Sequence, residues 1–219
     1  MRYESVANIF SQISKVYDRF LSTATAGQVH SWQKELISRM NPFGNWLDVG
    51  TGTGEVLKKL GDRYEGLRVG IDPAFGMLRV AKEKCPDCFF LQALGEELPF
   101  KNKSFKNISL SLVFRHLQDK KRFIEEAKRV LEEGGKVGII DIGRFRGTPV
   151  LLFLMRTILK PVGLLLFGRE KWDFFIHSVE ESYSLEEVRG MFEGKGFRLE
   201  YSNRRFLGVV QVAVFVKTA

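Results

Sequence analysis

Residues 46–54 read Trp-Leu-Asp-Val-Gly-Thr-Gly-Thr-Gly, and this stretch decides how the chain folds. Its first half is an apolar run that is typical of a short buried strand. Three glycines follow at once, Gly50, Gly52 and Gly54. Apolar residues then recur at helical spacing, at Val56, Leu57 and Leu60. A strand, a glycine turn and a helix in this order form a binding loop for nucleotide-like ligands, because glycine lets the main chain turn tightly and lets a ligand approach it.

The spacing of the glycines narrows the class of ligand. A dinucleotide loop needs a glycine at position 55, where this chain has Glu55. An acidic side chain at the start of a helix is a poor neighbour for a pyrophosphate, whereas Glu55 and Asp48 favour a cationic ligand such as a sulfonium or an α-ammonium. Asp72 ends a second apolar run, 22 residues after Gly50, where an acid can accept both hydroxyls of a ribose. The alternative is a plain βαβ turn with a carboxylate that caps the helix.

Size and composition are those of an ordinary globular protein. The 219 residues suffice for one domain with a three-layer core, and 44% of them are hydrophobic and 27% charged. The formal net charge of +8 fits a nucleic acid, an anionic membrane surface or simple solvation. Because the basic residues are spread along the chain, we favour a solvated surface over nucleic acid. No apolar signal segment follows Met1, so we expect a cytoplasmic protein, with contact at a membrane surface left open.

The two cysteines, Cys85 and Cys88, form a lone Cys-Pro-Asp-Cys pair. A zinc site would need two more ligands, and the chain has only three histidines. A redox pair usually opens a helix, whereas this pair is predicted between a helix and a strand. We therefore expect two loop thiols and no metal.

Strands and helices alternate through the centre of the chain, which predicts an α/β fold. We expect strands near residues 45–49, 67–71, 88–92, 107–113, 136–142, 197–202 and 206–216. We expect helices near residues 6–21, 29–40, 54–61, 74–84 and 119–131, and a last helix that starts at Ser184 with Glu187 completing a capping box. The single domain would comprise N-terminal helices (1–44), a ligand-binding core (45–142), an insertion (143–183) and a C-terminal helix with two strands (184–219).

The insertion contains a strongly apolar stretch over residues 149–168. Arg156, Lys160 and Pro161 interrupt it, so it is too broken for a helix that spans a membrane. An apolar stretch that emerges after the fifth strand is expected to cover a hydrophobic ligand or to contact a membrane surface. The alternative is that it packs on the domain or on a second subunit.

The glycine loop and Asp72 resemble those of the class I S-adenosylmethionine-dependent methyltransferases. Further stretches resemble one branch of that family, the C-methyltransferases of ubiquinone and menaquinone biosynthesis. These are Ile9-Phe10 with Val16-Tyr17-Asp18, the run Gln-Ala-Leu-Gly-Glu-Glu-Leu-Pro-Phe over residues 92–100, Phe114-Arg115-His116, Arg129-Val130-Leu131 with Gly134-Gly135, and Gly208-Val209-Val210. The resemblance covers nearly the whole chain.

This resemblance implies a Rossmann-like three-layer α/β/α sandwich, whose seven-stranded sheet is mostly parallel with one antiparallel strand. It also implies that S-adenosylmethionine binds and S-adenosylhomocysteine is released. The family's usual Asp or Asn two residues before Glu96 is Leu94 here, so we expect backbone atoms near Leu94 and Gly95 to bind the adenine. The candidate cofactor residues carried over by position are Asp48, Gly50, Thr51, Gly52, Gly54, Asp72, Pro73, Met77, Leu94, Gly95, Glu96 and Ser111.

Methyl transfer requires an aligned acceptor, and a carbon acceptor also requires a base. The candidate catalytic residues are His116, Asp141, Arg115 and Tyr17. His116 and Asp141 are expected at the rim where ligands bind in open α/β sheets, although each also fits a structural role as a cap or a hydrogen-bond acceptor. Arg115 would hold an acceptor oxygen or pair with an acid, and Tyr17 would cover the cofactor or anchor the first helix.

Three functions therefore compete. The first is a methyltransferase, monomeric or homodimeric, for a small or medium hydrophobic acceptor such as a quinol precursor. The second is an RNA methyltransferase, suggested by the net charge. Its amino-group members carry an Asn/Asp-Pro-Pro-aromatic stretch after the fourth strand, which residues 111–114 lack. The third is a module that binds S-adenosylmethionine without turnover.

Overall fold

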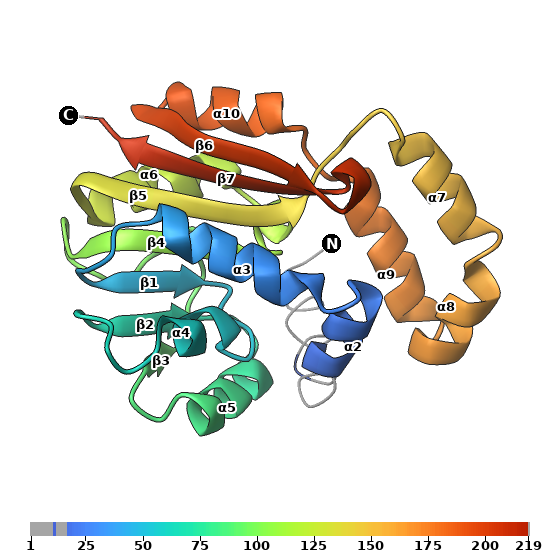
Figure 1. Ribbon diagram of the computed structural model, residues 1–219, viewed down its shortest axis with the longest axis horizontal. Coiled ribbons are helices and arrows are strands. Elements are labelled where there is room, and N and C mark those ends of the chain that lie inside the picture. The colour runs from blue at the N-terminus through green and yellow to red at the C-terminus, as the bar shows by residue number, and fades with distance from the viewer. Residues whose placement is uncertain (1–10, 12–16, 219) are drawn as a thin grey trace.

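The computed structural model describes residue 11 and residues 17–218, and its centre is one seven-stranded sheet (Figure 1). The strand order is β3-β2-β1-β4-β5-β7-β6. The strands are β1 (Trp46–Val49), β2 (Arg68–Ile71), β3 (Phe89–Leu91), β4 (Phe105–Ser111), β5 (Leu131–Ile142), β6 (Phe197–Arg205) and β7 (Val210–Lys217). Only β7 runs antiparallel to its neighbours, β5 and β6. The predicted α/β fold with one antiparallel strand is confirmed.

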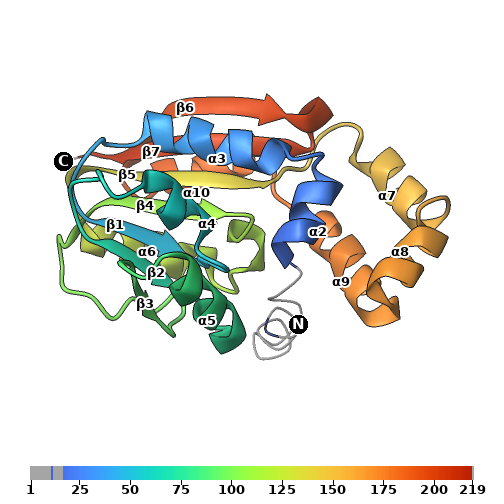
Figure 2. The ribbon, with the colours of Figure 1, turned by 60° about the horizontal axis from the view of Figure 1, so that its bottom comes forward.

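Helices cover both faces of this sheet, as Figures 1 and 2 show. One face carries α3 (Gln28–Arg39), α4 (Glu55–Leu60) and α5 (Phe75–Lys84), and the other carries α6 (Lys120–Val130) and α10 (Leu185–Glu193). Each helix lies close to the prediction, and α10 has the predicted capping box between Ser184 and Glu187. The last strand is shorter than predicted, because Phe206–Gly208 form a 3-10 turn in which Leu207 has a φ of 56°.

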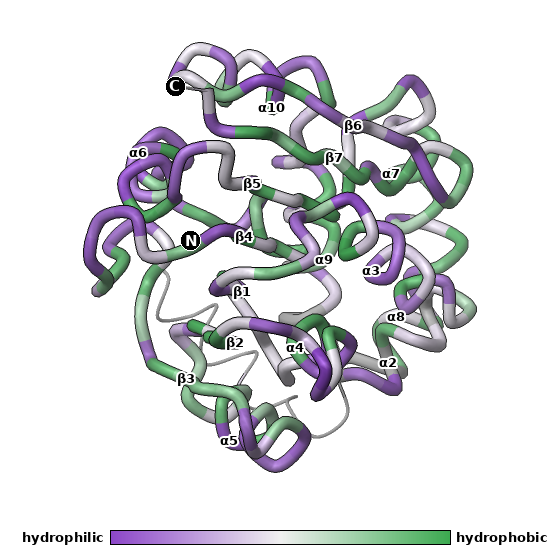
Figure 3. Tube along the Cα trace, turned by 60° about the vertical axis from the view of Figure 1, so that its left-hand side comes forward, coloured by the Kyte–Doolittle hydropathy of each residue, from purple (hydrophilic) through white to green (hydrophobic). Residues whose placement is uncertain are grey.

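Two hydrophobic clusters hold the layers together. On the face of α6 and α10, the ring of Phe192 stacks on Phe215 with centroids 4.3 Å apart and also meets Phe197 edge-on. On the opposite face, Trp32 and Leu36 of α3 pack with Val212 of β7, and Figure 3 shows β7 as a largely apolar segment. Because both faces are covered, the carboxyl edge of the parallel strands is where a ligand can reach the loops.

Three further helices follow β5 and stand beyond the carboxyl ends of the parallel strands (Figure 1). They are α7 (Thr148–Arg156), α8 (Lys160–Phe167) and α9 (Arg169–Glu180). Their own small core contains Met155, Trp172, Ile176 and Val179. Gly163 allows the close approach of α8 to α9, because a Cβ there would lie 2.3 Å from the Trp172 ring. We call residues 148–180 the helical insertion. Within the described residues, no helix combines the length and apolar character that crossing a bilayer requires.

The prediction of two free loop thiols is wrong. The cysteines are not free loop thiols: Cys85 and Cys88 form a disulfide that closes the turn between α5 and β3, where both residues are buried. Loop formation brings the two Cα atoms to 5.3 Å, within the range that a disulfide can bridge. The predicted helix over residues 6–21 lies mostly outside the described residues, and its end falls in α2 (Tyr17–Ala24).

Candidate functional site

The glycine loop joins β1 to α4 at the carboxyl edge of the sheet. Its three glycines have positive φ values of 64°, 54° and 78°, in the region that L side chains rarely adopt. A Cβ at Gly50 would lie 2.5 Å from Val113, and one at Gly54 would lie 3.1 Å from Ala81 of α5. A Cβ at Gly52 would meet nothing within 4 Å, so this glycine borders open space. Gly50 and Gly54 are therefore needed for packing, and Gly52 is the one that a ligand can approach.

Asp48 lies beneath the loop and supports it. Its carboxylate accepts hydrogen bonds from the hydroxyls of Thr51 at 2.7 Å and Ser109 at 2.5 Å. Burial raises the pKa of Asp48 to about 6, although these two hydrogen bonds act in the opposite direction. Asp48 is only 1% exposed, so it and Thr51 shape the loop from behind.

Asp72 ends β2 directly beside the loop. Its carboxylate accepts the main-chain N–H of Gly52 at 2.9 Å and that of Ala74 at 2.8 Å. Burial raises the pKa of Asp72 to about 6 against the effect of these two hydrogen bonds. The acid and the ligand-facing glycine are thus fixed to each other.

The sequence suggested that the Glu55 carboxylate favours a cationic ligand, but in the structure this carboxylate is paired with lysines. It forms ion pairs with Lys59 and Lys84, each at 2.8 Å. Burial alone would raise the pKa of Glu55, but the hydrogen bonds and charges of the two lysines outweigh it and lower the pKa to about 2. Lys84 also pairs with Asp18 of α2, whose other oxygen accepts the Thr53 hydroxyl at 2.5 Å. The sequence motif Val16-Tyr17-Asp18 does not by itself indicate this link between α2 and the loop.

A cleft of about 270 Å³ opens beside the loop. Five of the predicted cofactor residues line it: Gly50, Pro73, Leu94, Gly95 and Glu96. The carboxylate of Glu96 accepts the main-chain N–H of Gln118 at 2.7 Å, which ties the loop after β3 to the loop after β4. Met77 of α5 is buried and does not line the cleft. The other predicted cofactor residues that do not line it are Asp48, Thr51, Gly52, Gly54, Asp72 and Ser111. Ser111 lies at the end of β4, where it accepts a hydrogen bond from Gln33 at 3.2 Å.

A second, larger cavity of about 550 Å³ adjoins the first. It lies between the loop after β4 and the turn from α9 to α10. The two cavities share His116, Leu117 and Gln118. Burial, and then the charges of Arg115 and Lys120, lower the pKa of His116 well below its usual value. His116 is therefore a neutral imidazole at the junction of the two cavities.

The other catalytic candidates differ in their freedom to react. Arg115 and Asp141 form a buried ion pair, and the Asp141 carboxylate also accepts the main-chain N–H groups of Arg115 and Ile142, each at 2.8 Å. With its oxygens so engaged, Asp141 positions the loop after β4 and is not placed to act as a base. Tyr17 begins α2, and its side chain lies outside the described part of the structure. Among the described residues, no three His, Cys, Asp or Glu side chains gather where a metal ion could bind.

Comparison with known proteins decides which family this site belongs to. The model of the ubiE/COQ5 methyltransferase family matches residues 1–217. The chain belongs to this family. It is 29% identical over 203 residues to the demethylmenaquinone methyltransferase of Thermotoga maritima, covering 88% of each chain. It is 26% identical over 223 residues to the ubiquinone/menaquinone biosynthesis C-methyltransferase UbiE of Campylobacter jejuni, covering 94% of each.

The fold is also similar to that of a solved S-adenosylmethionine-dependent methyltransferase from Aquifex aeolicus. The TM-score is 0.60 at 22% identity, over 84% of this chain and 88% of that one. The predicted family and enzyme class are therefore confirmed, and S-adenosylmethionine is the methyl donor. Family membership also removes the hypothesis of a module without turnover.

The raised pKa of Asp48 leads to a test by pH. A carboxyl group whose pKa is raised by folding stabilises the fold fully below its unfolded pKa of about 4, and this contribution is lost as the pH rises through about 6. As the pH rises from about 4 to about 7, we expect the free energy of unfolding to fall by roughly 1–3 kcal/mol more in wild type than in Asp48→Asn. Urea denaturation at a series of pH values measures this difference. Parallel losses in both proteins would contradict the assignment.

Proposed function

We propose that this enzyme methylates a small, hydrophobic acceptor whose reacting ring carries a hydroxyl group, as a quinol precursor does. The observation that supports this most is the junction of two cavities at a neutral His116. One cavity has Gly50 of the loop and the main-chain groups of Leu94 and Gly95, which suit the cofactor. The other is lined mainly by polar and charged side chains and has room for the hydroxylated ring of the acceptor. The two relatives, a demethylmenaquinone methyltransferase and a ubiquinone/menaquinone biosynthesis C-methyltransferase, support the same class of acceptor.

We assign the cofactor to the smaller cleft. The residues fit it, because Gly52 next to the cleft borders open space and donates its main-chain N–H to the buried Asp72 carboxylate, although neither residue lines the cleft itself. Asp72 would accept the ribose hydroxyls, and main-chain atoms of Leu94 and Gly95 would meet the adenine. Gly50 and Pro73 line the cleft, and Asp48, Thr51 and Gly54 keep the loop in shape. When bound, S-adenosylmethionine supplies an electrophilic methyl group on a sulfonium.

The chain's own residues would align the acceptor and take up its proton. His116 is neutral, so an imidazole nitrogen can accept a proton from the acceptor hydroxyl. The Arg115–Asp141 pair holds the short helical turn Phe114–His116 against β5 and thereby fixes the position of His116. Tyr17 stays a candidate for covering the cofactor.

A second prediction concerns Asp72, the acid proposed to bind the ribose. We expect Asp72→Ala to weaken S-adenosylhomocysteine binding by roughly 1.5–3 kcal/mol for each lost charge-assisted hydrogen bond. Asp72→Asn keeps an acceptor oxygen for the Gly52 N–H and should lose less. Calorimetry with wild type and both variants checks this, and circular dichroism serves as the folding control. An unchanged dissociation constant in Asp72→Ala would show that another residue binds the ribose.

The acceptor itself can be identified directly. Enzyme and isotopically labelled methyl donor would be incubated with a lipid extract and, separately, with RNA, and the products analysed by mass spectrometry. We expect label in a hydroxylated ring compound from the lipid extract, and a loss of about 10²–10⁴-fold in rate for His116→Ala. Label in RNA alone would favour the rival hypothesis, since the +8 charge suits nucleic acid too.

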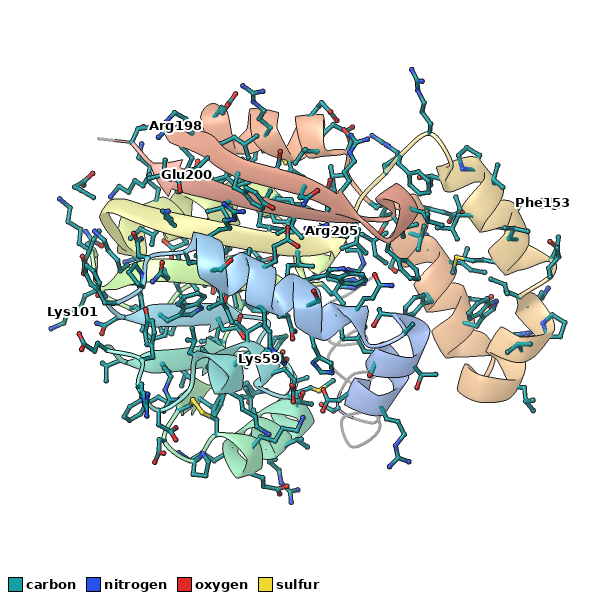
Figure 4. All side chains as sticks on the ribbon, viewed as in Figure 1. Lys59, Lys101, Phe153, Arg198, Glu200 and Arg205 are labelled. Atoms are coloured by element: carbon teal, nitrogen blue, oxygen red, sulfur yellow. A yellow bond between two sulfur atoms is a disulfide. The ribbon has the colours of Figure 1, made fainter. Side chains whose placement is uncertain are left out.

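We further propose that residues 143–183 form a lid that also contacts the membrane surface. Apolar side chains of the helical insertion are exposed, and Leu165 is 85% exposed and Phe153 62%. Figure 4 shows Phe153 pointing away from the body of the molecule. Residues 142–169 contain five arginine or lysine residues and no aspartate or glutamate. This combination suits an anionic lipid surface, from which a hydrophobic acceptor would be delivered.

A liposome assay tests this contact. We expect the double variant Phe153→Ser with Leu165→Ser to stay folded and bind S-adenosylhomocysteine, and to lose most of its sedimentation with anionic vesicles. Phe89→Ser is the matched control, because Phe89 is similarly exposed on the edge strand β3. A double variant that changes oligomeric state in solution, with vesicle binding intact, would show that the insertion contacts a second subunit.

A further inference from the structure

Most cationic side chains that line the larger cavity lie close to a carboxylate, but one does not. Arg115 pairs with Asp141, and Arg144 pairs with Glu187. On the far wall, His177 lies 3.2 Å from Glu181. Lys120, at the start of α6, lines the same cavity, and within the described part of the chain no carboxylate lies within 4 Å of its ammonium group. The wall that carries Lys120 therefore has an uncompensated positive charge.

The ammonium group is held in a fixed place. It donates hydrogen bonds to the main-chain oxygens of Leu117 at 2.6 Å and Arg115 at 3.3 Å. It also lies 5.1 Å from the centre of the Tyr183 ring, which packs edge-on against Phe114. An ammonium has three N–H donors, so one remains for a ligand. A partly buried cation in a fixed position binds an anionic oxygen more strongly than a neutral one.

His116 stands on the same wall. It lines both cavities, and the main-chain oxygens of its two neighbours in the chain, Arg115 and Leu117, accept the hydrogen bonds of Lys120, which places a proton acceptor close to the cation. A hydroxyl group that enters here meets a base for its proton and a cation for the charge that remains.

We propose that Lys120 is the specificity-determining residue of the acceptor site, and that it binds the oxygen of a phenolic or enolic acceptor as the anion. The inference rests on the proposed function, whose acceptor carries a ring hydroxyl. The O–H bond breaks, its proton goes to an imidazole nitrogen of His116, and the electron pair stays on the oxygen. A Lys120 N–H then donates a hydrogen bond to that oxygen. No oxidant or reductant takes part, and the negative charge is shared with the ring carbons that are to be methylated.

The test uses 4-nitrophenol as probe, because its phenol and phenolate forms absorb visible light differently. We expect the wild-type enzyme to bind the phenolate preferentially, so that the bound probe ionises at lower pH than the free probe. In Lys120→Met, which keeps the length and apolar stem of the side chain, phenolate binding should weaken about tenfold or more. Lys120→Arg should restore most of the affinity.

Two controls make the result specific. Lys121→Met removes the neighbouring, exposed lysine and should leave probe binding unchanged. The neutral 4-nitroanisole should bind wild type and Lys120→Met equally, because its oxygen is methylated and it has no hydroxyl group that can ionise. S-adenosylhomocysteine binding, measured in the same samples, reports on the proposed function separately from the role of Lys120.

Other results would contradict the role of Lys120 or the proposed function. If Lys120→Met binds the phenolate as wild type does, or if it weakens 4-nitroanisole to the same extent, Lys120 only caps the turn after β4. If Lys120→Met does not fold, the wild-type titration alone decides, because a bound probe that ionises no more readily than the free one overturns the proposal. If wild type binds the phenolate but neither binds S-adenosylhomocysteine nor transfers a methyl group, the proposed function is wrong instead.

Discussion

The site depends on the hydrogen bond between the main-chain N–H of Gly52 and the carboxylate of Asp72. It joins the loop glycine at which a Cβ would meet nothing within 4 Å to the acid that directly follows β2. Asp48 supports the same loop from below through the Thr51 and Ser109 hydroxyls. Both acids are buried, so their charged forms are stable only while the loop keeps its shape and its donors. The loop geometry and the two carboxylates are therefore a single unit, and the cofactor cleft opens beside it.

A second unit fixes the reacting end of the site. The ion pair between Arg115 and Asp141 is buried, and the same carboxylate accepts the Arg115 main-chain N–H. It thereby fastens the turn that carries His116 to the end of β5. A buried pair of this kind contributes little net stability, but it is costly to break and so enforces one geometry. His116 stays neutral where the two cavities meet, because burial, and then the charges of Arg115 and Lys120, lower its pKa.

The helical insertion has two different surfaces. The end of α9 contributes polar and charged side chains to the larger cavity, namely His177, Ser178 and Glu180. On α7 and α8, apolar side chains such as Phe153, Val162 and Leu165 are exposed, and basic residues accompany them. A molecule with a polar head and an apolar remainder is complementary to such a division. The small core around Met155 and Trp172 keeps the two surfaces together.

The sequence by itself determined the strands, the main helices, the glycine loop and the family, because hydrophobic periodicity and glycine spacing are local properties. It also placed His116 and Asp72 at the carboxyl edge. Tertiary structure alone decided which charges are free. Glu55 looked available to a cationic ligand and is neutralised by Lys84, which lies 29 residues away. Asp141 looked like a base and is engaged by Arg115, 26 residues away.

The same limit explains what sequence analysis missed. Nothing local marks Lys120 as the cation without a counter-ion. Asp18 meets Thr53 and Lys84 only after α2 has packed on the loop. A hydrogen bond or an ion pair depends on distances of a few ångströms between segments far apart in the chain, and folding alone sets those distances.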